Sequence, residues 1–379
     1  MRTLLISELF LPRVGGTPTW FHDVYSHYPS GEAVVLTDLQ ADDEDFDRHY
    51  SLPIVRIPMR MNDWGFLNLQ SAKQYARVAQ ATCQLMRDRH MQIAHCARVM
   101  PEGVVGYLLW LFTRLPYCVY AHGEEIGTAL ASRQLTFLMR RAYGNARAII
   151  ANSRNTRSLL TEIGVAEAKI RVISPGVDIN RFTPGDVARA RATLGLAGQP
   201  LLLSVGRLQR RKGHDMTIRA LRTVVKEFPN VKYAIAGAGE EEDRLRALAK
   251  HMGVGQHVHF AGRVPNEQLL DYYRACDLFV MPNREEANQD IQGFGIVFLE
   301  AAACAKPAIG GRSGGTNDAV MDGETGLLVD GESPCEIAEA MLSLLRDKAK
   351  AEDIGRRGRA HAVKYFSSEQ VVKRIRQLE

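Results

Sequence analysis

The sequence predicts an α/β protein made of two doubly wound domains, each with a parallel sheet covered by helices on both faces. With 379 residues, the chain exceeds the size at which a single hydrophobic core usually keeps growing. Short apolar runs rich in Val and Ile alternate with longer amphipathic segments, which is the pattern of parallel β-α-β units. The alternation pauses near the middle of the chain and then restarts, so two such domains are expected.

The first series of apolar runs predicts the strands of an N-terminal domain. They lie at Thr3–Ser7, Ala33–Thr37, Ile54–Ile57, Gln92–His95, Tyr117–Ala121, Ala146–Ala151 and Arg171–Ser174. Amphipathic patterns at 66–89 and 154–163 predict helices in two of the gaps. The segment 103–115 is apolar along its whole length and predicts a buried helix.

The second series predicts a C-terminal domain of the same type. Its strands are expected at Leu201–Val205, Val231–Ala236, His257–Phe260, Leu278–Met281, Pro307–Ile309 and Leu327–Val329, with helices near 213–228, 240–252, 266–275, 296–304 and 333–347. Pro-Gly breaks at both ends of 174–185 indicate the join. We therefore expect domains at 1–180 and 181–364, with a helix at 365–379 that packs back on the first domain.

Composition narrows the class of protein. The apolar fraction of 46% and the charged fraction of 24% are those of an ordinary globular protein. A net charge of +5 suits anionic ligands or a membrane surface but is too weak to indicate nucleic acid. The six cysteines form no CxxC pair, which favours buried thiols in a reducing compartment. No apolar run of about 18 residues and no signal peptide are apparent, so a cytoplasmic protein is expected.

Ligands of open α/β sheets bind beyond the carboxyl ends of the strands, so the motifs at those ends are the informative ones. Arg207 and Lys212 lie in the basic loop 204–213, directly after the first strand of the second domain. A guanidinium binds phosphate through two hydrogen bonds, and an ammonium acts as a point charge. This loop predicts a phosphate site; the alternative is a solvated basic surface.

The segment Gln292–Glu300 is the second motif of this domain. Gly293 and Gly295 allow φ > 0 and a close approach of the backbone, and the N–H groups at the start of the following helix then face the ligand and favour negative charge. Glu300, about two turns further on, can accept hydrogen bonds from a diol. The alternative is a glycine turn before a core helix.

Weaker signals lie at other strand ends. Gly15 and Gly16 can offer backbone amides to a phosphate or form a plain loop. His122 ends a strand, where a catalytic or a structural histidine is expected. The Gly-Ala-Gly at 237–239 is either a partial dinucleotide fingerprint or a close-packed turn. The acidic stretch 42–47 is interpreted as a solvated loop and not as a DxD metal site, because no convincing apolar strand precedes it. Glu285, Glu286 and Asp290 either face sugar hydroxyls or solvate their loop.

Together these elements resemble the retaining glycosyltransferases of the GT-B fold, in the large family that includes phosphatidylinositol mannosyltransferases and bacterial exopolysaccharide mannosyl- and glucosyltransferases. The resemblance extends over nearly the whole chain: the GG loop, the HG strand end, the GR-x4-KG loop, and the blocks 262–283 and 299–320. It implies two facing Rossmann-like domains, with the active site in the cleft between them. The second domain would bind a nucleotide sugar, and the first an acceptor.

The resemblance also implies roles for individual residues. Arg207 and Lys212 would bind the diphosphate, approached by Gly15 and Gly16, and His122 would contact the donor sugar. The remaining donor contacts would come from the backbone of Arg263 and Val264 at the base, Glu300 at the ribose, and the amides of Phe294 and Gly295 at the sugar or phosphate. Cations and helix N-termini would replace a metal ion, and no cofactor is expected.

One position departs from the family pattern. The first glutamate of the family's E-x7-E motif corresponds to Gln292, which keeps the shape and one acceptor but loses the charge. Three explanations stay open: natural tolerance, compensation by Asp290 or Glu286, and a weakened enzyme. A nucleotide-sugar-binding protein with little transferase activity is therefore the alternative from another class. A sugar-nucleotide epimerase and a dehydrogenase fit the motifs less well.

The favoured function is transfer of a hexose, with retention, to a lipid-linked or polysaccharide-precursor acceptor. GDP-mannose is the preferred donor, with UDP-glucose and UDP-N-acetylglucosamine as alternatives. Basic residues beside apolar ones on the helices near 66–89 and 132–147 suggest peripheral binding to an anionic membrane on its inner face; the alternative is ordinary amphipathic packing. The basic residues in question are Lys73, Arg77, Arg87, Arg89, Arg133, Arg140, Arg141 and Arg147.

Overall fold

The computed structural model describes residues 1–379 except 14, 41–42, 62, 66–67, 197–199 and 287–291. Its contacts divide the chain into two compact units. Unit 1 contains Met1–Gly176 together with Ser368–Glu379, and unit 2 contains Val177–Ser367. The chain therefore crosses into unit 2 at 176–177 and returns to unit 1 at 367–368.

The described part of unit 1 contains a seven-stranded sheet in the order β3-β2-β1-β4-β5-β6-β7, with every pairing parallel. The strands are β1 (Thr3–Ser7), β2 (Ala33–Asp38), β3 (Ile54–Ile57), β4 (Ile93–Cys96), β5 (Tyr117–Ala121), β6 (Ala148–Ala151) and β7 (Ile170–Val172). From β1 the chain continues to β2 and β3 on one side of the sheet, and from β4 it continues to β5, β6 and β7 on the other side. The strand order therefore reverses between β1 and β4.

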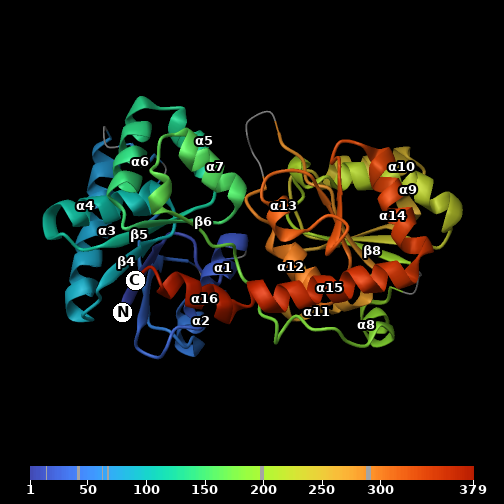
Figure 1. Cartoon of the computed structure of the whole chain (residues 1–379), viewed down its shortest axis with the longest axis horizontal. Helices are drawn as coiled ribbons and strands as arrows, with labels where there is room; N and C mark the ends of the chain where they lie inside the picture. Colours follow the sequence, from blue (N-terminus) through green and yellow to red (C-terminus); the bar gives the residue numbers. More distant parts are fainter. Residues whose placement is uncertain (14, 41–42, 62, 66–67, 197–199, 287–291) are drawn as a thin grey trace. The chain divides into compact units, whose positions relative to one another are not determined.

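Helices cover both faces of this sheet (Figure 1). They are α1 (Gly16–Tyr25), α2 (Asp43–His49), α3 (Leu69–Asp88), α4 (Val104–Thr113), α5 (Glu124–Leu130), α6 (Arg133–Asn145) and α7 (Arg154–Glu162), with short turns η1 (Val99–Gly103) and η2 (Glu167–Lys169). Leu4 and Ile6 pack in one core with α3, α4 and α6. Side chains of alternate residues point to the opposite face, where Tyr25 of α1 lies against His95 and Tyr120.

The C-terminal helix belongs to unit 1. α15 (Lys348–Phe366) ends before Ser367, and α16 (Ser368–Arg376) begins after it, so the expected helix at 365–379 is interrupted. Glu379 accepts hydrogen bonds from Thr3 (2.9 Å) and Tyr28 (2.6 Å), and α16 lies against α1 (Figure 1). The last residues of the chain thus complete the packing around β1.

The described part of unit 2 contains a six-stranded parallel sheet in the order β10-β9-β8-β11-β12-β13. The strands are β8 (Leu201–Val205), β9 (Lys232–Ala236), β10 (Val258–Gly262), β11 (Leu278–Met281), β12 (Ala308–Gly311) and β13 (Gly326–Val329). Here the order reverses between β8 and β11. Both sheets confirm the predicted α/β class.

Unit 2 has two hydrophobic cores, and alternate residues of β8 point into each of them. Leu201 and Leu203 pack with α8, α11, α12 and α15, while Leu202 packs with α9, α10 and α14. The helices are α8 (Val187–Leu194), α9 (His214–Glu227), α10 (Glu242–His251), α11 (Asn266–Ala275), α12 (Ile296–Ala303), α13 (Thr316–Ala319) and α14 (Pro334–Arg346), with turns η3 (Arg210–Lys212) and η4 (Gly255–His257). Runs buried on both faces explain why these strands read as continuous apolar segments.

Three sequence predictions need correction. The acidic stretch near 42–47 is not a loop, because Asp43–His49 forms α2, where Asp47 pairs with Arg56 at 2.7 Å. The helix at 103–115 is buried only in its first part, since Leu111 and Phe112 near its end are exposed. Of the two glycines before α12, only Gly295 has a positive φ, of 99°. In the described residues, no helix is long and apolar enough to cross a bilayer.

Candidate active site

The site of unit 2 is built at the reversal of its strand order. The loop after β8 carries Gly206 and Arg207 and continues into η3, while the loop after β11 carries Asn283 and Arg284. Because both strands are parallel, their carboxyl ends meet at the same edge of the sheet. These two loops therefore frame the position where a ligand is expected.

The basic loop contains two kinds of cation. Arg207 and Arg210 are exposed, whereas Arg211 is buried and Lys212 is half-buried. The amide oxygen Oε1 of Gln292 accepts hydrogen bonds from Arg211 Nη1 at 2.9 Å and from Lys212 Nζ at 2.6 Å. The structure thus joins Lys212 to Gln292 directly and adds Arg211, which the sequence reasoning did not single out. Its place in the basic run is the signal that could have found it.

The amide of Gln292 has a physical consequence for the charge of this cluster. A carboxylate at 292 would neutralise part of the positive charge of Arg211 and Lys212, whereas the neutral amide holds both side chains without itself adding a negative charge. Gln292 is 9% exposed, so the cluster lies at the edge of the solvent. The arrangement suits an anionic ligand.

An ion pair supports the loops behind this cluster. Arg284 donates to both carboxylate oxygens of Asp215, at 2.9 and 3.2 Å, and the backbone N–H of Arg284 donates to the carbonyl of Arg211 at 2.9 Å. Burial acts to raise the pKa of Asp215, but the hydrogen bonds and charge of Arg284 outweigh it, so the pKa lies below its usual value. Asp215 and Arg284 therefore connect the start of α9 to the turn that carries Arg211.

The start of α12 lies next to Gln292. Gly295 caps the helix, and Phe294 is buried, so the loop enters the core and then turns back to present the first amides of α12. A Cβ on Gly315 would lie 2.0 Å from the carbonyl oxygen of Gly293, which means that the two loops pack backbone to backbone. The N–H groups in the first turn of a helix favour an anion or hydroxyl oxygens.

Glu300 lies on the second turn of α12 and is 7% exposed. Its Oε2 accepts a hydrogen bond from the Tyr273 hydroxyl at 2.5 Å. Burial raises the pKa of Glu300, and the hydrogen bond from Tyr273 opposes that rise. Tyr273 thus holds the carboxyl group of Glu300 in one orientation.

The remaining predicted donor contacts lie on neighbouring loops. Arg263 is exposed and Val264 is half-buried in the connection from β10 to α11. The Gly-Ala-Gly at 237–239 is a close-packed turn, because a Cβ on Gly237 would lie 1.8 Å from the Gly206 carbonyl oxygen. Glu285 is exposed and Glu286 pairs with Arg284 at 3.4 Å, while Asp290 lies outside the described residues.

In unit 1, the predicted residues lie at the corresponding edge. Gly15 caps α1, and a Cβ on Gly16 would meet open space, so packing within unit 1 does not require a glycine there. His122 follows β5 and is 8% exposed. Its Nε2–H donates to the Ala97 carbonyl at 2.9 Å, which leaves Nδ1 as the acceptor of the neutral ring.

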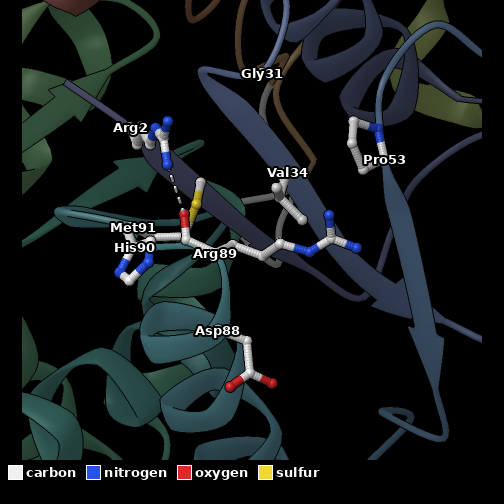
Figure 2. A pocket seen from close by; sticks show the side chains of 8 residues that line it. All are labelled: Arg2, Gly31, Val34, Pro53, Asp88, Arg89, His90 and Met91. Carbon is white, nitrogen blue, oxygen red and sulfur yellow. Dashed lines mark hydrogen bonds between the residues drawn. The ribbon is translucent and has the colours of Figure 1, made fainter.

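A surface cavity of unit 1 lies at the opposite ends of the strands, near the amino-terminal ends of β1 to β4. Figure 2 shows Arg2, which precedes β1, and Met91, which precedes β4, with Arg2 donating to the Arg89 carbonyl at 3.4 Å. Pro53 before β3 completes the amino-terminal side. This cavity is therefore separate from the strand ends that carry the predicted site residues.

Comparison with known proteins agrees with this arrangement. Residues 14–181 match the model of Glycosyltransferase Family 4, and residues 186–361 match that of Glycosyl transferases group 1. The chain is 39% identical over 289 residues to a GDP-mannose-dependent alpha-(1-6)-phosphatidylinositol monomannoside mannosyltransferase of Mycolicibacterium smegmatis, covering 76% of this chain and 75% of that protein. It is 28% identical over 383 residues to the corresponding monoacylated-substrate mannosyltransferase of Corynebacterium glutamicum, covering 99% and 96%.

Solved structures share the fold. Anabaena HepE, in complex with UDP and glucose, has a TM-score of 0.82 at 22% identity, covering 100% of this chain and 98% of that one. Sucrose-phosphate synthase of Thermosynechococcus elongatus has a TM-score of 0.82 at 24% identity, covering 99% and 97%. Together with the two parallel sheets, these likenesses identify the GT-B fold. The chain belongs to the glycosyl transferases group 1 family and is a glycosyltransferase.

Proposed function

We propose that this enzyme transfers mannose from GDP-mannose, with retention of the anomeric configuration, to a phosphatidylinositol-based glycolipid. The observation that carries the proposal is the cluster in which Arg211 and Lys212, from the loop after β8, both donate to the neutral amide oxygen of Gln292, from the loop after β11. The choice of donor and acceptor rests on relatives named for GDP-mannose and for phosphatidylinositol monomannoside. UDP-glucose and UDP-N-acetylglucosamine are the alternative donors.

The proposed chemistry is electrostatic. As the bond between the sugar and the diphosphate breaks, negative charge grows on the leaving phosphate, and Arg207 and Lys212 stabilise it. The acceptor hydroxyl attacks from the side on which the diphosphate leaves and passes its proton to a phosphate oxygen. These cations and the N-terminus of α12 would perform the work that a metal ion performs in other transferases, so activity is expected to persist in EDTA.

The same proposal assigns the other residues of the donor site. Glu300, oriented by Tyr273, would accept hydrogen bonds from the ribose hydroxyls. The backbone at Arg263 and Val264 would border the base, and the amides of Phe294 and Gly295 would hold the sugar or phosphate. From unit 1, Gly15 and Gly16 would approach the diphosphate, and Nδ1 of His122 would accept from a sugar hydroxyl.

Calorimetric titration tests the donor. GDP is expected to bind more tightly than UDP, and GDP-mannose is then the donor to assay with the glycolipid acceptor. Tighter binding of UDP would move the proposal to glucose or N-acetylglucosamine transfer. If neither nucleotide bound to the folded protein, the transferase site proposed here would be wrong. The anomeric configuration of the product, read by NMR, tests retention.

We also propose that unit 1 binds an anionic membrane surface through exposed aromatic and basic side chains of α4 and α6, two helices that pack against each other. Phe112 and Phe137 are 84% and 56% exposed, and Arg141 lies over the Phe137 ring at 5.1 Å. Arg140 is also exposed on α6. Aromatic side chains can enter the interface while arginines meet anionic headgroups, each worth about 1 kcal/mol. The basic residues of α3 are exposed too, but its apolar face is buried in the core.

Vesicle co-sedimentation tests this surface. Binding to phosphatidylinositol-containing vesicles is expected at low salt and is expected to weaken at high salt. The variant Arg140→Glu/Arg141→Glu should lose most of the binding. The matched control Arg219→Glu/Arg222→Glu makes the same charge change on the exposed face of α9 and should bind like the wild type. Equal loss in both variants would show that net charge, and not this surface, controls binding.

A further inference from the structure

A second cluster of charged residues lies at the reversal of strand order in unit 1. Glu8 directly follows β1, Arg98 lies two residues after β4, and Glu102 lies in η1. Arg98 Nη2 donates to Glu8 Oε2 at 3.1 Å and to Glu102 Oε1 at 3.5 Å, while the backbone N–H of Glu8 donates to Glu102 Oε1 at 2.8 Å. The cluster thus joins the ends of the two strands between which ligands of such sheets bind.

These side chains differ in their access to solvent. Glu102 is fully buried, whereas Glu8 and Arg98 keep 11% and 13% of their side-chain surface exposed. In the described part of the chain, Oε2 of Glu102 and Nε of Arg98 are buried without a hydrogen-bond partner. A buried polar atom left without a partner is costly, so this cluster has hydrogen-bonding capacity that its own contacts do not use.

The balance of charge at this cluster is opposite to that of the donor site. Two carboxylates share one guanidinium, and Glu125 on α5 adds a third acidic group whose charge acts on Arg98. Burial and the neighbouring charges of Glu102 and Asp38 raise the pKa of Glu8, and Arg98 and Arg13 oppose the rise. An anion would be repelled here, whereas hydroxyl groups, which both donate and accept, would find a carboxylate acceptor and a guanidinium donor.

The cluster is also connected to His122. The Ala97 carbonyl that accepts from His122 Nε2 belongs to the residue before Arg98, and the backbone N–H of His122 donates to Glu125 Oε1 at 2.9 Å. The imidazole and the Glu8–Arg98 pair therefore lie on adjoining strand ends of one sheet.

We propose that Glu8 and Arg98 bind the hydroxyl groups of a neutral polyol ring, the part of the acceptor that receives the sugar, and that Glu102 is a positioning residue that holds both. This inference rests on the proposed function for the identity of the acceptor. Glu8 accepts hydrogen bonds from ring hydroxyls, and Arg98 donates to their oxygens. The neutral, hydroxyl-rich part of the acceptor is thus recognised by unit 1, and the anionic diphosphate by the cations of unit 2.

The experiment uses the full chain with two soluble probes, myo-inositol and methyl α-mannoside, titrated by ligand-observed NMR in the presence of GDP. One polyol is expected to bind, and the probe that binds distinguishes a cyclitol from a hexose. In Glu8→Gln, its Kd should rise about 10-fold or more, the scale of one hydrogen bond to a charged group. The control Glu44→Gln, at an exposed carboxylate of α2, should match the wild type.

Binding should also weaken as the pH falls, because a protonated Glu8 loses acceptor capacity, and Glu8→Gln should flatten this dependence. A purely structural Glu8 would not give that pH signature. Arg98→Lys keeps the charge but loses the guanidinium fork, so it provides a second, independent loss of affinity. Polyol affinity unchanged in both variants, or no polyol binding to the wild type, would overturn the inference. GDP titration of the same samples reports on the donor site, so failure of the proposed function is seen separately.

Discussion

Replacing Gln292 with Glu tests how the donor site controls its charge. The new carboxylate would take over the two hydrogen bonds that the amide oxygen accepts from Arg211 Nη1 at 2.9 Å and from Lys212 Nζ at 2.6 Å. Two opposite charges about 4 Å apart attract by about 4 kcal/mol at the effective dielectric of a protein edge. Desolvation of the carboxylate offsets much of this, and the amide already holds both cations. A net gain of about 1–2 kcal/mol in the free energy of unfolding of unit 2 is therefore expected.

The same substitution should weaken the binding of an anionic nucleotide. The cations would be partly neutralised before the ligand arrives, so an equal free energy is lost from GDP binding. The melting temperature of unit 2 should rise by about 2–8 °C, and the Kd for GDP should rise about 5- to 30-fold. Differential scanning calorimetry and isothermal titration at low salt measure the two quantities on one sample.

If the cluster has the proposed role, the stability of unit 2 and its affinity for GDP change in opposite directions. Gln268→Glu makes the same change of charge at an exposed position of α11 and should alter neither quantity appreciably. A variant Gln292→Glu with wild-type melting temperature and wild-type GDP affinity would refute the proposed role of the cluster. Turnover of the variant answers a second question: a large gain in kcat would show that glutamine weakens the enzyme, and no gain would show that it is tolerated.

Three further predictions concern single residues. Lys212→Ala should lower kcat/KM about 10²- to 10³-fold, roughly 3 kcal/mol, because a hydrogen-bond donor to the developing negative charge is lost. Unchanged steady-state kinetics in both Lys212→Ala and Arg207→Ala would contradict the proposed diphosphate site. Asp215→Asn should lower the free energy of unfolding by about 3 kcal/mol at pH 7, because buried Arg284 loses a carboxylate that accepts two of its hydrogen bonds and keeps the pairing with Glu286 at 3.4 Å. Arg284 keeps the pKa of Asp215 low, so the stabilisation by this pair exists above about pH 4 and is lost as the pH falls through the folded-state pKa of Asp215. Comparing the free energy of unfolding at pH 7 and pH 3 measures this loss. Burial lowers the pKa of His95 to about 3, so below about pH 6.5 the unfolded state binds a proton that the folded state does not. The free energy of unfolding should therefore fall by about 2 kcal/mol at pH 5. In urea titrations, His95→Gln should remove that part of the pH dependence.

Much of the fold was predictable because the strands are buried on both faces. Three strands of unit 1 and two of unit 2, among them β1 and β8, have the bounds expected from the apolar runs. The predictions were wrong where the local sequence pattern favours one structure and long-range packing favours another. Asp47 of the acidic stretch pairs with Arg56 from β3, and this distant contact accompanies a helix at 43–49 where a loop was expected.

The donor motifs were predictable one by one, but their contacts were not. Lys212 and Gln292 each stood out in the sequence, yet nothing local indicates that they share a hydrogen bond across 80 positions. Arg211 was missed because a buried arginine and an exposed one look alike in a basic run. Glu8 and Arg98 were missed for a related reason, since no short motif contains two residues that are 90 positions apart.

The sequence by itself therefore determined the class of the protein: apolar periodicity specifies parallel sheets, and glycine and basic residues at strand ends specify loops that suit a diphosphate. The tertiary structure alone decided which side chains meet. Strand order brings the loops after β8 and β11 together in unit 2, and the ends of β1 and β4 together in unit 1. The physical reason is that hydrogen bonds and charge interactions act over a few ångströms in space, regardless of the separation of their residues along the chain.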